Sequence, residues 1–193
     1  MEKEFLRKIY LDKMAALSAG ELEDKSQGIA GVFFENFDPD QHKAIHIFIS
    51  ITRNNELNTF HIINRLLKDY AHIRIGVPKS DFKSLAISSY EYTLESKLKI
   101  NKLGIPEPQN GKIIDPADFS IVLVPLLCFD KNGYRVGYGK GFYDRYLVNT
   151  GKNCLKIGLS LFEPVDLISD TDQHDIRLDF CITPGKLYSF PKK

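Results

Sequence analysis

Four glycines interleaved with charged and aromatic side chains make the segment 130–146 the strongest constraint on what this chain can form. An apolar run at 121–125 precedes the segment, and residues 142–148 are typical of the start of a helix, whose N-terminus carries partial positive charge. Glycines allow successive backbone N–H groups to turn inward and allow a ligand to come close. Arg135 and Lys140 add full charges, and Asp144 follows as a candidate metal ligand. The segment therefore predicts a polyphosphate site.

Common phosphate motifs do not account for this segment. It contains no GxxxxGK[ST] sequence, and Gly137, Gly139 and Gly141 follow the spacing GxGxG rather than the GxGxxG of dinucleotide-binding folds. The alternative is a tight connection that uses glycine for its positive φ angles. A plain turn rarely carries four glycines with interleaved cations, which favours the phosphate site. We expect neither Arg135 nor Lys140 to be needed for folding.

Length and charge limit the other function classes. The 193 residues fit one domain, 1–193, that is large enough to bury a substantial core. A formal net charge of +1 argues against a protein that coats nucleic acid, so any anion site has to be local. Three cysteines cannot form a complete disulfide framework, residues 1–13 are too charged for a signal peptide, and no apolar run approaches the roughly 20 residues of a membrane span. We expect a cytoplasmic protein, monomeric, with no nucleic-acid or membrane partner.

Hydrophobic periodicity predicts an α/β fold with a mostly parallel sheet, because strands alternate with helices. Residues 93–103 are ambiguous, a short helix at best, whereas the prolines within 104–108 favour an extended chain. A capping box at Ser18 and Glu21 starts the second helix. Helices are expected over 2–17, from Ser18 to before Asp38, over 59–70 and from 142 onward. Strands are expected over 44–51, 73–78, 85–92, 121–125, 154–159 and 180–183.

Two further sets of charged residues each allow a functional and a plainer interpretation. Lys3 and Arg7 lie four residues apart on the first expected helix, where they either hold an anion between them or form a solvated basic face. Glu56 ends the polar loop 53–56, just past the carboxyl end of an expected strand, where open α/β sheets bind ligands. By itself, Glu56 would be a solvated loop acid.

Two residues are weaker candidates on sequence grounds alone. Asp175 follows a histidine in a loop and would by itself cap the strand that comes next. His46 lies inside an isoleucine-rich strand, so we expect it in the core or at a sheet edge rather than as a ligand. Neither His46 nor the pair at 174–175 matches a zinc-binding spacing.

The glycine-rich segment resembles the hallmark motif of the 5-formyltetrahydrofolate cyclo-ligase (methenyltetrahydrofolate synthetase) family, which reads about VPxxxFDxxGxRxGxGxGYYDRYL. The matching residues run from Val124-Pro125 through Phe129-Asp130 to Leu147. Phe142 stands where tyrosine is commoner, so a hydroxyl group cannot be essential at that position here. Three shorter elements of the family also match: KxxxR at 3–7, ExxT at 56–59 and HDxxxD at 174–179.

This resemblance implies the three-layer α/β/α fold that cyclo-ligases share with sugar-phosphate isomerases and CoA transferases. It also implies that ATP and 5-formyltetrahydrofolate, a reduced folate, give 5,10-methenyltetrahydrofolate, ADP and phosphate, with Mg²⁺ as cofactor. Arg135 and Lys140 are the implied catalytic residues, Glu56 contacts the folate, and Asp144 and Asp175 hold magnesium. The implied ATP-binding residues are Lys3, Arg7, Arg135, Gly137, Tyr138, Gly139, Lys140, Gly141, Phe142 and Tyr143. Five of these are also implied in substrate binding: Tyr138, Gly139, Lys140, Gly141 and Phe142.

Two other functions stay open on the sequence alone. A sugar-phosphate isomerase of the same fold class would use such a loop for one phosphate group and would need neither ATP nor the Lys3–Arg7 pair. A non-catalytic module that binds a phosphate ligand or RNA is the other alternative, although the net charge of +1 argues against RNA. Incubation with ATP and a reduced folate separates these functions.

Overall fold

The computed structural model describes residues 1–51 and 54–191, and a single large sheet forms their centre. Its strands are β1 (Ala44–His46), β2 (Arg74–Asp81), β3 (Ala86–Tyr92), β6 (Ile113–Ile114), β7 (Ile121–Pro125), β10 (Leu155–Leu159), β11 (Phe180–Thr183) and β12 (Lys186–Ser189). They lie in the order β12-β11-β10-β7-β1-β2-β3-β6, and the five from β11 to β2 run parallel. Antiparallel β12, β3 and β6 complete the edges. The expected mostly parallel sheet is confirmed.

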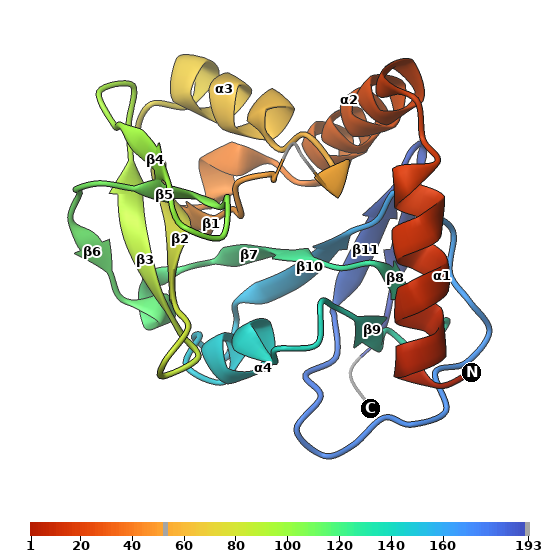
Figure 1. Cartoon of the computed structure of the whole chain (residues 1–193). Helices are drawn as coiled ribbons and strands as arrows, with labels where there is room; N and C mark the ends of the chain where they lie inside the picture. Colours follow the sequence, from red (N-terminus) through yellow and green to blue (C-terminus); the bar gives the residue numbers. More distant parts are fainter. Residues whose placement is uncertain (52–53, 192–193) are drawn as a thin grey trace.

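Helices on both faces of the sheet confirm the three-layer α/β/α arrangement. They are α1 (Lys3–Ala15), α2 (Ala19–Asn36), α3 (Phe60–Asp69) and α4 (Phe142–Leu147). Helices α2 and α3 lie over one face of the sheet and α4 lies against the other (Figure 1). The capping box is present, since the Ser18 side chain accepts from the Glu21 N–H at 3.2 Å while the Glu21 carboxylate accepts from the Ser18 N–H at 2.9 Å.

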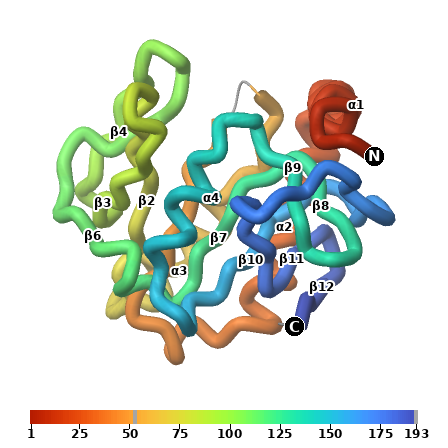
Figure 2. Tube along the Cα trace, turned by 90° about the horizontal axis from the view of Figure 1, so that it is seen from below, coloured from red at the N-terminus to blue at the C-terminus, as the bar shows by residue number. Residues whose placement is uncertain are grey.

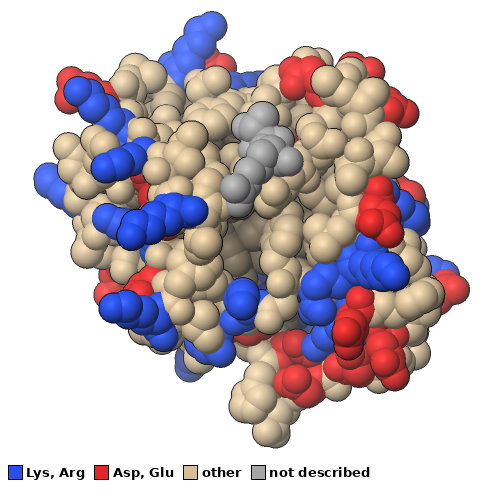
Figure 3. Space-filling view, in the orientation of Figure 1, with Lys and Arg blue, Asp and Glu red and all other residues tan. Residues whose placement is uncertain are grey.

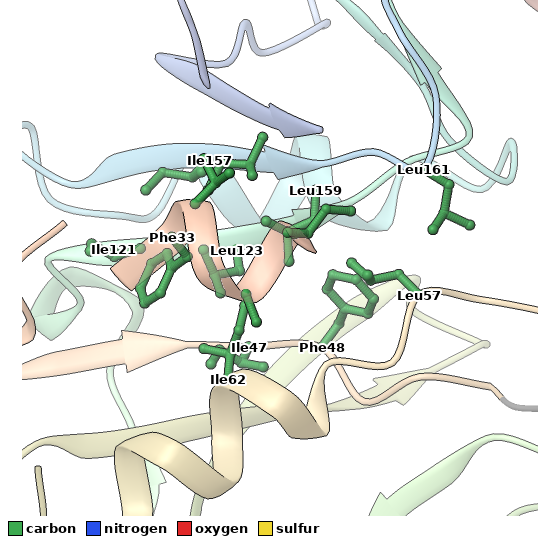
Figure 4. Packing of buried hydrophobic residues seen from close by; sticks show 14 of the residues in the cluster. Phe33, Ile47, Phe48, Leu57, Ile62, Ile121, Leu123, Ile157, Leu159 and Leu161 are labelled. Carbon is green, nitrogen blue, oxygen red and sulfur yellow. The ribbon is translucent and has the colours of Figure 1, made fainter. Parts of the chain in front are cut away.

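Alternation along the central strands explains the two faces. In β7, Ile121 and Leu123 pack into the core shared with α2 and α3, whereas Val122 and Val124 pack with Tyr146 and other residues on the α4 side. A strand buried on both faces in this way is apolar throughout, which is why 121–125 is recognisable from the sequence. Figure 4 shows the first of these cores, with Phe33 from α2 and Ile62 from α3 closing over Ile121 and Leu123.

Helix α1 stands at one end of the sheet, beside a hairpin that the sequence did not predict. This hairpin pairs β8 (Cys128–Phe129) with β9 (Arg135–Val136). Figure 2 shows α1 set against these two short strands, away from α4. Leu6, Tyr10 and Met14 form the buried side of α1. The same hairpin carries the start of the glycine-rich segment, so α1 lies next to that segment as well.

The expected strand 44–51 ends early, at His46. The Ile47 N–H still donates to the Gly76 carbonyl at 2.8 Å, but the following residues bond to the loop that comes after them. The Thr59 hydroxyl donates to the Phe48 carbonyl at 2.8 Å, and the Ile51 N–H donates to the Glu56 carboxylate at 2.9 Å. Arg53, the first residue of the expected polar loop 53–56, lies outside the described residues.

The expectation of a short helix within 93–103 is wrong. These residues instead contain β4 (Leu98–Ile100), which pairs antiparallel with β5 (Pro106–Pro108) in a separate hairpin. The extended conformation expected for 104–108 is confirmed by β5. The hairpin contacts β2, where the Ser80 N–H donates to the Glu107 carboxylate at 3.3 Å, so it leans over the carboxyl end of the sheet.

Candidate functional site

One cavity of about 530 Å³ brings together every residue for which the sequence predicted a role. It lies beyond the carboxyl ends of β1, β2 and β7, the edge at which α/β sheets bind ligands. Figure 3 shows a hollow on this face, with lysine and arginine side chains on both sides of it. The predicted residues among its lining are Lys3, Arg7, Glu56, Arg135, Gly137, Tyr138, Gly139, Lys140, Gly141, Phe142, Tyr143, Asp144 and Asp175.

The cavity opens because β1 and β7 separate. Their pairing ends at His46 and Val122, whereas β7 continues to pair with β10 as far as Pro125. Phe48 and Ile49, which leave the sheet at this point, line the cavity together with Pro125. The early end of β1 is therefore the feature that makes room for a ligand.

Helix α1 holds the glycine-rich segment in place through Arg7. The Arg7 Nε–H donates to the Gly137 carbonyl at 3.1 Å. Gly139 has φ = +89°, and a Cβ atom there would lie 3.2 Å from the Arg7 guanidinium carbon. The positive φ therefore favours glycine at 139, and a side chain there would also have to displace the Arg7 guanidinium by a few tenths of an ångström.

Gly137 is glycine for a different reason. Its φ is not positive, and a Cβ atom there would meet no other atom within 4 Å. Folding therefore leaves room for a side chain at this position, and the residue lines the cavity. Space of this kind beside a backbone is what a closely approaching ligand needs.

Two ion pairs contribute four residues to the lining of the cavity. Arg135 Nη2–H donates to Asp144 Oδ1 at 2.7 Å, and Lys3 Nζ–H donates to Asp175 Oδ2 at 2.5 Å. The Ile176 N–H also donates to Asp144 Oδ1, at 3.2 Å, so Asp144 contacts the backbone directly after Asp175. The structure thus joins residues from three distant parts of the chain in one charged cluster.

The contacts of Arg135 argue against the expectation that it is not needed for folding. The residue is only 9% exposed, and besides Asp144 it donates to the Ile176 carbonyl. Removal of this guanidinium would leave the partly exposed Asp144 carboxylate without its cation partner and the half-buried Ile176 carbonyl without this donor, which we expect to be destabilising. Lys140 differs, because its side chain is exposed at the edge of the cavity.

The two acids fit a magnesium ion that is shared with a ligand. Within residues 1–51 and 54–191, no group of three or more His, Cys, Asp or Glu side chains is arranged to hold a metal, so a cage made only of such side chains is absent there. Magnesium is usually bound by one or two carboxylates together with substrate phosphates and water. Asp144 and Asp175 would supply a pair of oxygen ligands of this kind at the wall of the cavity.

Glu56 also lines the cavity, and it is buried rather than solvated. It is 8% exposed, and its carboxylate accepts from the Ile51 N–H at 2.9 Å. Burial raises the pKa of Glu56, and hydrogen bonds from Tyr138 and the Ile51 N–H oppose that rise. The loop is fixed by Thr59, whose N–H and hydroxyl bond to Ser50 Oγ and the Phe48 carbonyl, each at 2.8 Å. The spacing ExxT thus combines one cavity residue with one loop anchor.

We predict that Glu56→Gln flattens the dependence of stability on pH. Because the folded pKa of Glu56 is raised above its ordinary value of 4.5, the folded state binds this proton more tightly than the unfolded chain does. The contribution of Glu56 to the free energy of unfolding is complete at pH values below the ordinary pKa of 4.5, and it declines as the pH rises through the higher pKa of the folded state. Urea unfolding of both proteins at a series of pH values measures it, and an unchanged decline in the variant would refute the assignment.

The sequence profile of the 5-formyltetrahydrofolate cyclo-ligase family matches residues 1–184. The chain belongs to this family. It is 27% identical over 202 residues to the probable 5-formyltetrahydrofolate cyclo-ligase of Schizosaccharomyces pombe, with 97% of each chain covered. It is 40% identical over 74 residues to the 5-formyltetrahydrofolate cyclo-ligase of Mycoplasma genitalium, a match that spans 38% of this chain and 45% of that relative.

Solved structures agree with this membership. The chain resembles the 5,10-methenyltetrahydrofolate synthetase of Aquifex aeolicus with a TM-score of 0.77 at 27% identity, covering 100% of this chain and 95% of that one. For the Mycoplasma pneumoniae 5,10-methenyltetrahydrofolate synthetase the TM-score is 0.76 at 28% identity, with 95% and 99% covered. The resemblance seen in the sequence is confirmed, and the cyclo-ligase fold with it.

The apolar wall of the cavity is the part of this cyclo-ligase fold that sequence reasoning missed. Phe82, at the tip of the β2–β3 hairpin, packs edge-on against Phe142 with ring centroids 5.2 Å apart. The β4–β5 hairpin adds Leu103 and Ile105. In a sequence, such residues look like ordinary core positions. The clearest signal was Phe82 itself, an aromatic residue within a polar turn at 79–84.

Among the helices of the described residues, none is long and apolar enough to cross a membrane.

Proposed function

We propose that this protein catalyses the ATP-dependent cyclisation of 5-formyltetrahydrofolate to 5,10-methenyltetrahydrofolate, with release of ADP and phosphate. The observation that carries the proposal is the convergence on one cavity of the four sequence elements at 3–7, 56–59, 130–146 and 174–179. The cavity lining combines cations and glycines with a buried acid and apolar side chains. A lining of this mixed kind suits both a polyphosphate and a flat heterocycle.

The chemistry of the proposed reaction explains why the cavity has to hold both a polyphosphate and a folate. An N-formyl amide is a poor electrophile, and its oxygen is a poor leaving group. Transfer of the γ-phosphoryl group from ATP to the formyl oxygen gives an imidate-like phosphate and ADP. N10 then attacks the formyl carbon, phosphate leaves, and N10 loses its proton. In such a reaction the protein mainly positions the two substrates and neutralises charge.

The residues proposed to bind the phosphates divide that work. The backbone at Gly137 gives the phosphate chain a close approach, and Lys140 is free to reach an anion from the edge of the cavity. Lys3 and Arg7 extend from α1 to the same segment. Asp144 and Asp175 would hold magnesium, which supplies positive charge to the phosphate oxygens when bound. Arg135 keeps Asp144 in position through its 2.7 Å hydrogen bond.

An absorbance assay for methenyl-folate formation tests the proposal. The purified protein is incubated with 5-formyltetrahydrofolate, with and without ATP and with and without magnesium. We expect product only when all three are present. Absence of product under all conditions, together with interconversion of a phosphorylated sugar, would favour the isomerase alternative instead. The same preparation, examined by light scattering, tests whether the single domain is a monomer as we propose; a cytoplasmic location is part of the same proposal.

We predict that Glu56→Gln raises the KM for the folate by about tenfold, the effect of losing one hydrogen bond to a charged group, and leaves the KM for ATP nearly unchanged. Glu56 belongs to neither ion pair, and the amide keeps the volume of the carboxylate while it changes the pattern of donors and acceptors. Steady-state kinetics with each substrate varied in turn measures the two constants. A larger change in the KM for ATP than for the folate would contradict the assignment of Glu56 to folate binding.

We predict that Asp144→Asn raises the magnesium concentration needed for half-maximal turnover. The amide is a weaker metal ligand than the carboxylate, although it preserves most of the side-chain volume. Because Asp144 also accepts from Arg135, we expect the melting temperature to fall as well. A magnesium titration of activity, beside thermal unfolding without ligand, separates the two roles. A lowered melting temperature with an unchanged magnesium midpoint would remove Asp144 from the metal site.

A further inference from the structure

A buried polar cluster lies directly behind the cavity wall, on the α4 side of the sheet. At its centre is His46, which ends β1 and is fully buried. His46 Nε2 lies 3.2 Å from the hydroxyl oxygen of Tyr143. His46 Nδ1 lies 3.0 Å from Ser89 Oγ and 3.1 Å from the hydroxyl oxygen of Tyr146. Ser89 Oγ and the Tyr146 hydroxyl are themselves 2.5 Å apart. Figure 1 shows how α4, which carries both tyrosines, crosses beneath the sheet.

Every group in the cluster is uncharged. Burial lowers the pKa of His46 to about 3, so its ring carries one hydrogen on nitrogen near neutral pH. Burial raises the pKa of both Tyr143 and Tyr146 above the ordinary value of 10.0, so their hydroxyl hydrogens are retained. The cluster therefore has a fixed set of hydrogens, and only their placement is undecided.

The triangle of Nδ1, Ser89 Oγ and the Tyr146 hydroxyl decides that placement. Within the described part of the chain, these three atoms hydrogen-bond only with one another. If Nδ1 has no hydrogen, one hydroxyl donates to the other, the second donates to Nδ1, and both hydrogens are used. If Nδ1 carried the hydrogen, three hydrogens would share the triangle and one buried O–H would be left without an acceptor, at an appreciable cost. The ring hydrogen therefore belongs on Nε2.

We infer that His46 is a positioning residue, which donates from Nε2 to the Tyr143 oxygen and so directs the Tyr143 hydroxyl hydrogen into the cavity. Tyr143 lines the cavity together with Glu56 and Arg135, and of these two charges Glu56 raises the pKa of Tyr143 while Arg135 lowers it. Tyr143 thus shares the cavity with the residues proposed to bind the folate and with those proposed to bind the phosphates. On the proposed function, the acceptor is the formyl oxygen that receives the phosphoryl group. No motif marks His46, because its partners lie 43, 97 and 100 residues away.

Nitrogen NMR of ¹⁵N-histidine protein tests the first half of this inference without any substrate. The chemical shifts of the two ring nitrogens report which one carries the hydrogen. We expect the Nε2–H form for His46, identified by the signal that disappears in His46→Gln. Should that variant fail to fold, replacement of the other four histidines, one at a time, identifies the His46 signal by elimination. A resting ring with its hydrogen on Nδ1 would overturn the inference, whether or not the protein proves to be a cyclo-ligase.

Kinetics of paired variants tests whether His46 acts on turnover through Tyr143. We expect Tyr143→Phe to lower kcat by about 10- to 100-fold, the range for a hydrogen bond to a charged acceptor, with a smaller effect on the KM for the folate. His46→Leu should lower kcat similarly in the parent but not further in the Tyr143→Phe background. His46→Gln, whose amide retains a donor, should recover most of the loss. Equal losses from His46→Leu in both backgrounds would show that His46 does not act through Tyr143.

A matched control separates positioning from general stability. Ser160 is also fully buried and donates a side-chain hydrogen bond, to the Phe162 carbonyl at 2.7 Å, but it does not line the cavity. Ser160→Ala should lower the melting temperature and leave kcat unchanged. A loss of kcat in Ser160→Ala as large as that in His46→Leu would assign both effects to weakened folding and overturn the positioning role.

Discussion

Gly137→Ala is expected to abolish most ATP-dependent turnover while the free protein becomes no less stable. The backbone at 137 is not in the left-handed region, and a Cβ atom would meet no other atom within 4 Å. Replacement of glycine at such a site usually stabilises a protein by about 0.4–1 kcal/mol, because the unfolded chain has less freedom to lose. A phosphate chain that approaches the backbone here would be displaced by the methyl group, and misplacement by about 1 Å can lower the rate roughly 100-fold.

Two other glycines make the comparison sharp. Gly20 in α2 likewise has no atom within 4 Å of a built Cβ, but it lies outside the cavity, so Gly20→Ala should be at least as stable and fully active. Gly139→Ala should lose both stability and activity, because its positive φ and its contact with Arg7 are structural. Thermal unfolding and kcat/KM for ATP, measured on all three variants, give the pattern. Full activity in Gly137→Ala would mean that no ligand approaches the backbone at this point.

The contrast between these glycines marks how far the sequence alone could lead. Glycine spacing with interleaved cations predicted a phosphate site, and the segment does line the cavity at the carboxyl edge of the sheet. Nothing in the spacing distinguishes Gly139, which the fold requires, from Gly137, which it does not. That distinction depends on where Arg7 lies, and Arg7 comes from a helix 130 residues earlier in the chain.

The elements that the sequence predicted well are those whose signal is local. Apolar strands such as β7 and the capping box of α2 carry their own patterns, and both are found as expected. The β4–β5 hairpin has no alternating apolar pattern and is stabilised by contact with β2, so 93–103 looked irregular. Arg135 likewise looked like a free loop cation, because its partners Asp144 and Ile176 are brought to it only by the fold.

Lys140→Ala should separate binding chemistry from folding most cleanly among the cations. Lys3 and Arg135 are paired with acids and Arg7 with a carbonyl group, so their removal disturbs the structure as well as the cavity. Of the cavity cations that the structure describes, the exposed Lys140 can be removed with least structural consequence. We expect an unchanged melting temperature and a fall in kcat of about 100- to 1,000-fold, the usual effect of removing one group that stabilises charge in a transition state.

Lys152→Ala is the control for the loss of one positive charge near α4, because Lys152 is exposed and lies outside the cavity lining. It should retain the parent rate at every salt concentration. The two variants should also differ in ATP binding. Loss of a direct contact with the phosphates weakens the binding of ATP more than that of AMP, whereas loss of a remote charge weakens both only slightly. Isothermal titration with the two nucleotides measures the difference. If Lys140→Ala and Lys152→Ala behaved alike in both assays, Lys140 would be a solvated lysine. The phosphate chain would then be held by the glycine backbone and by the charged side chains that α1 contributes to the cavity.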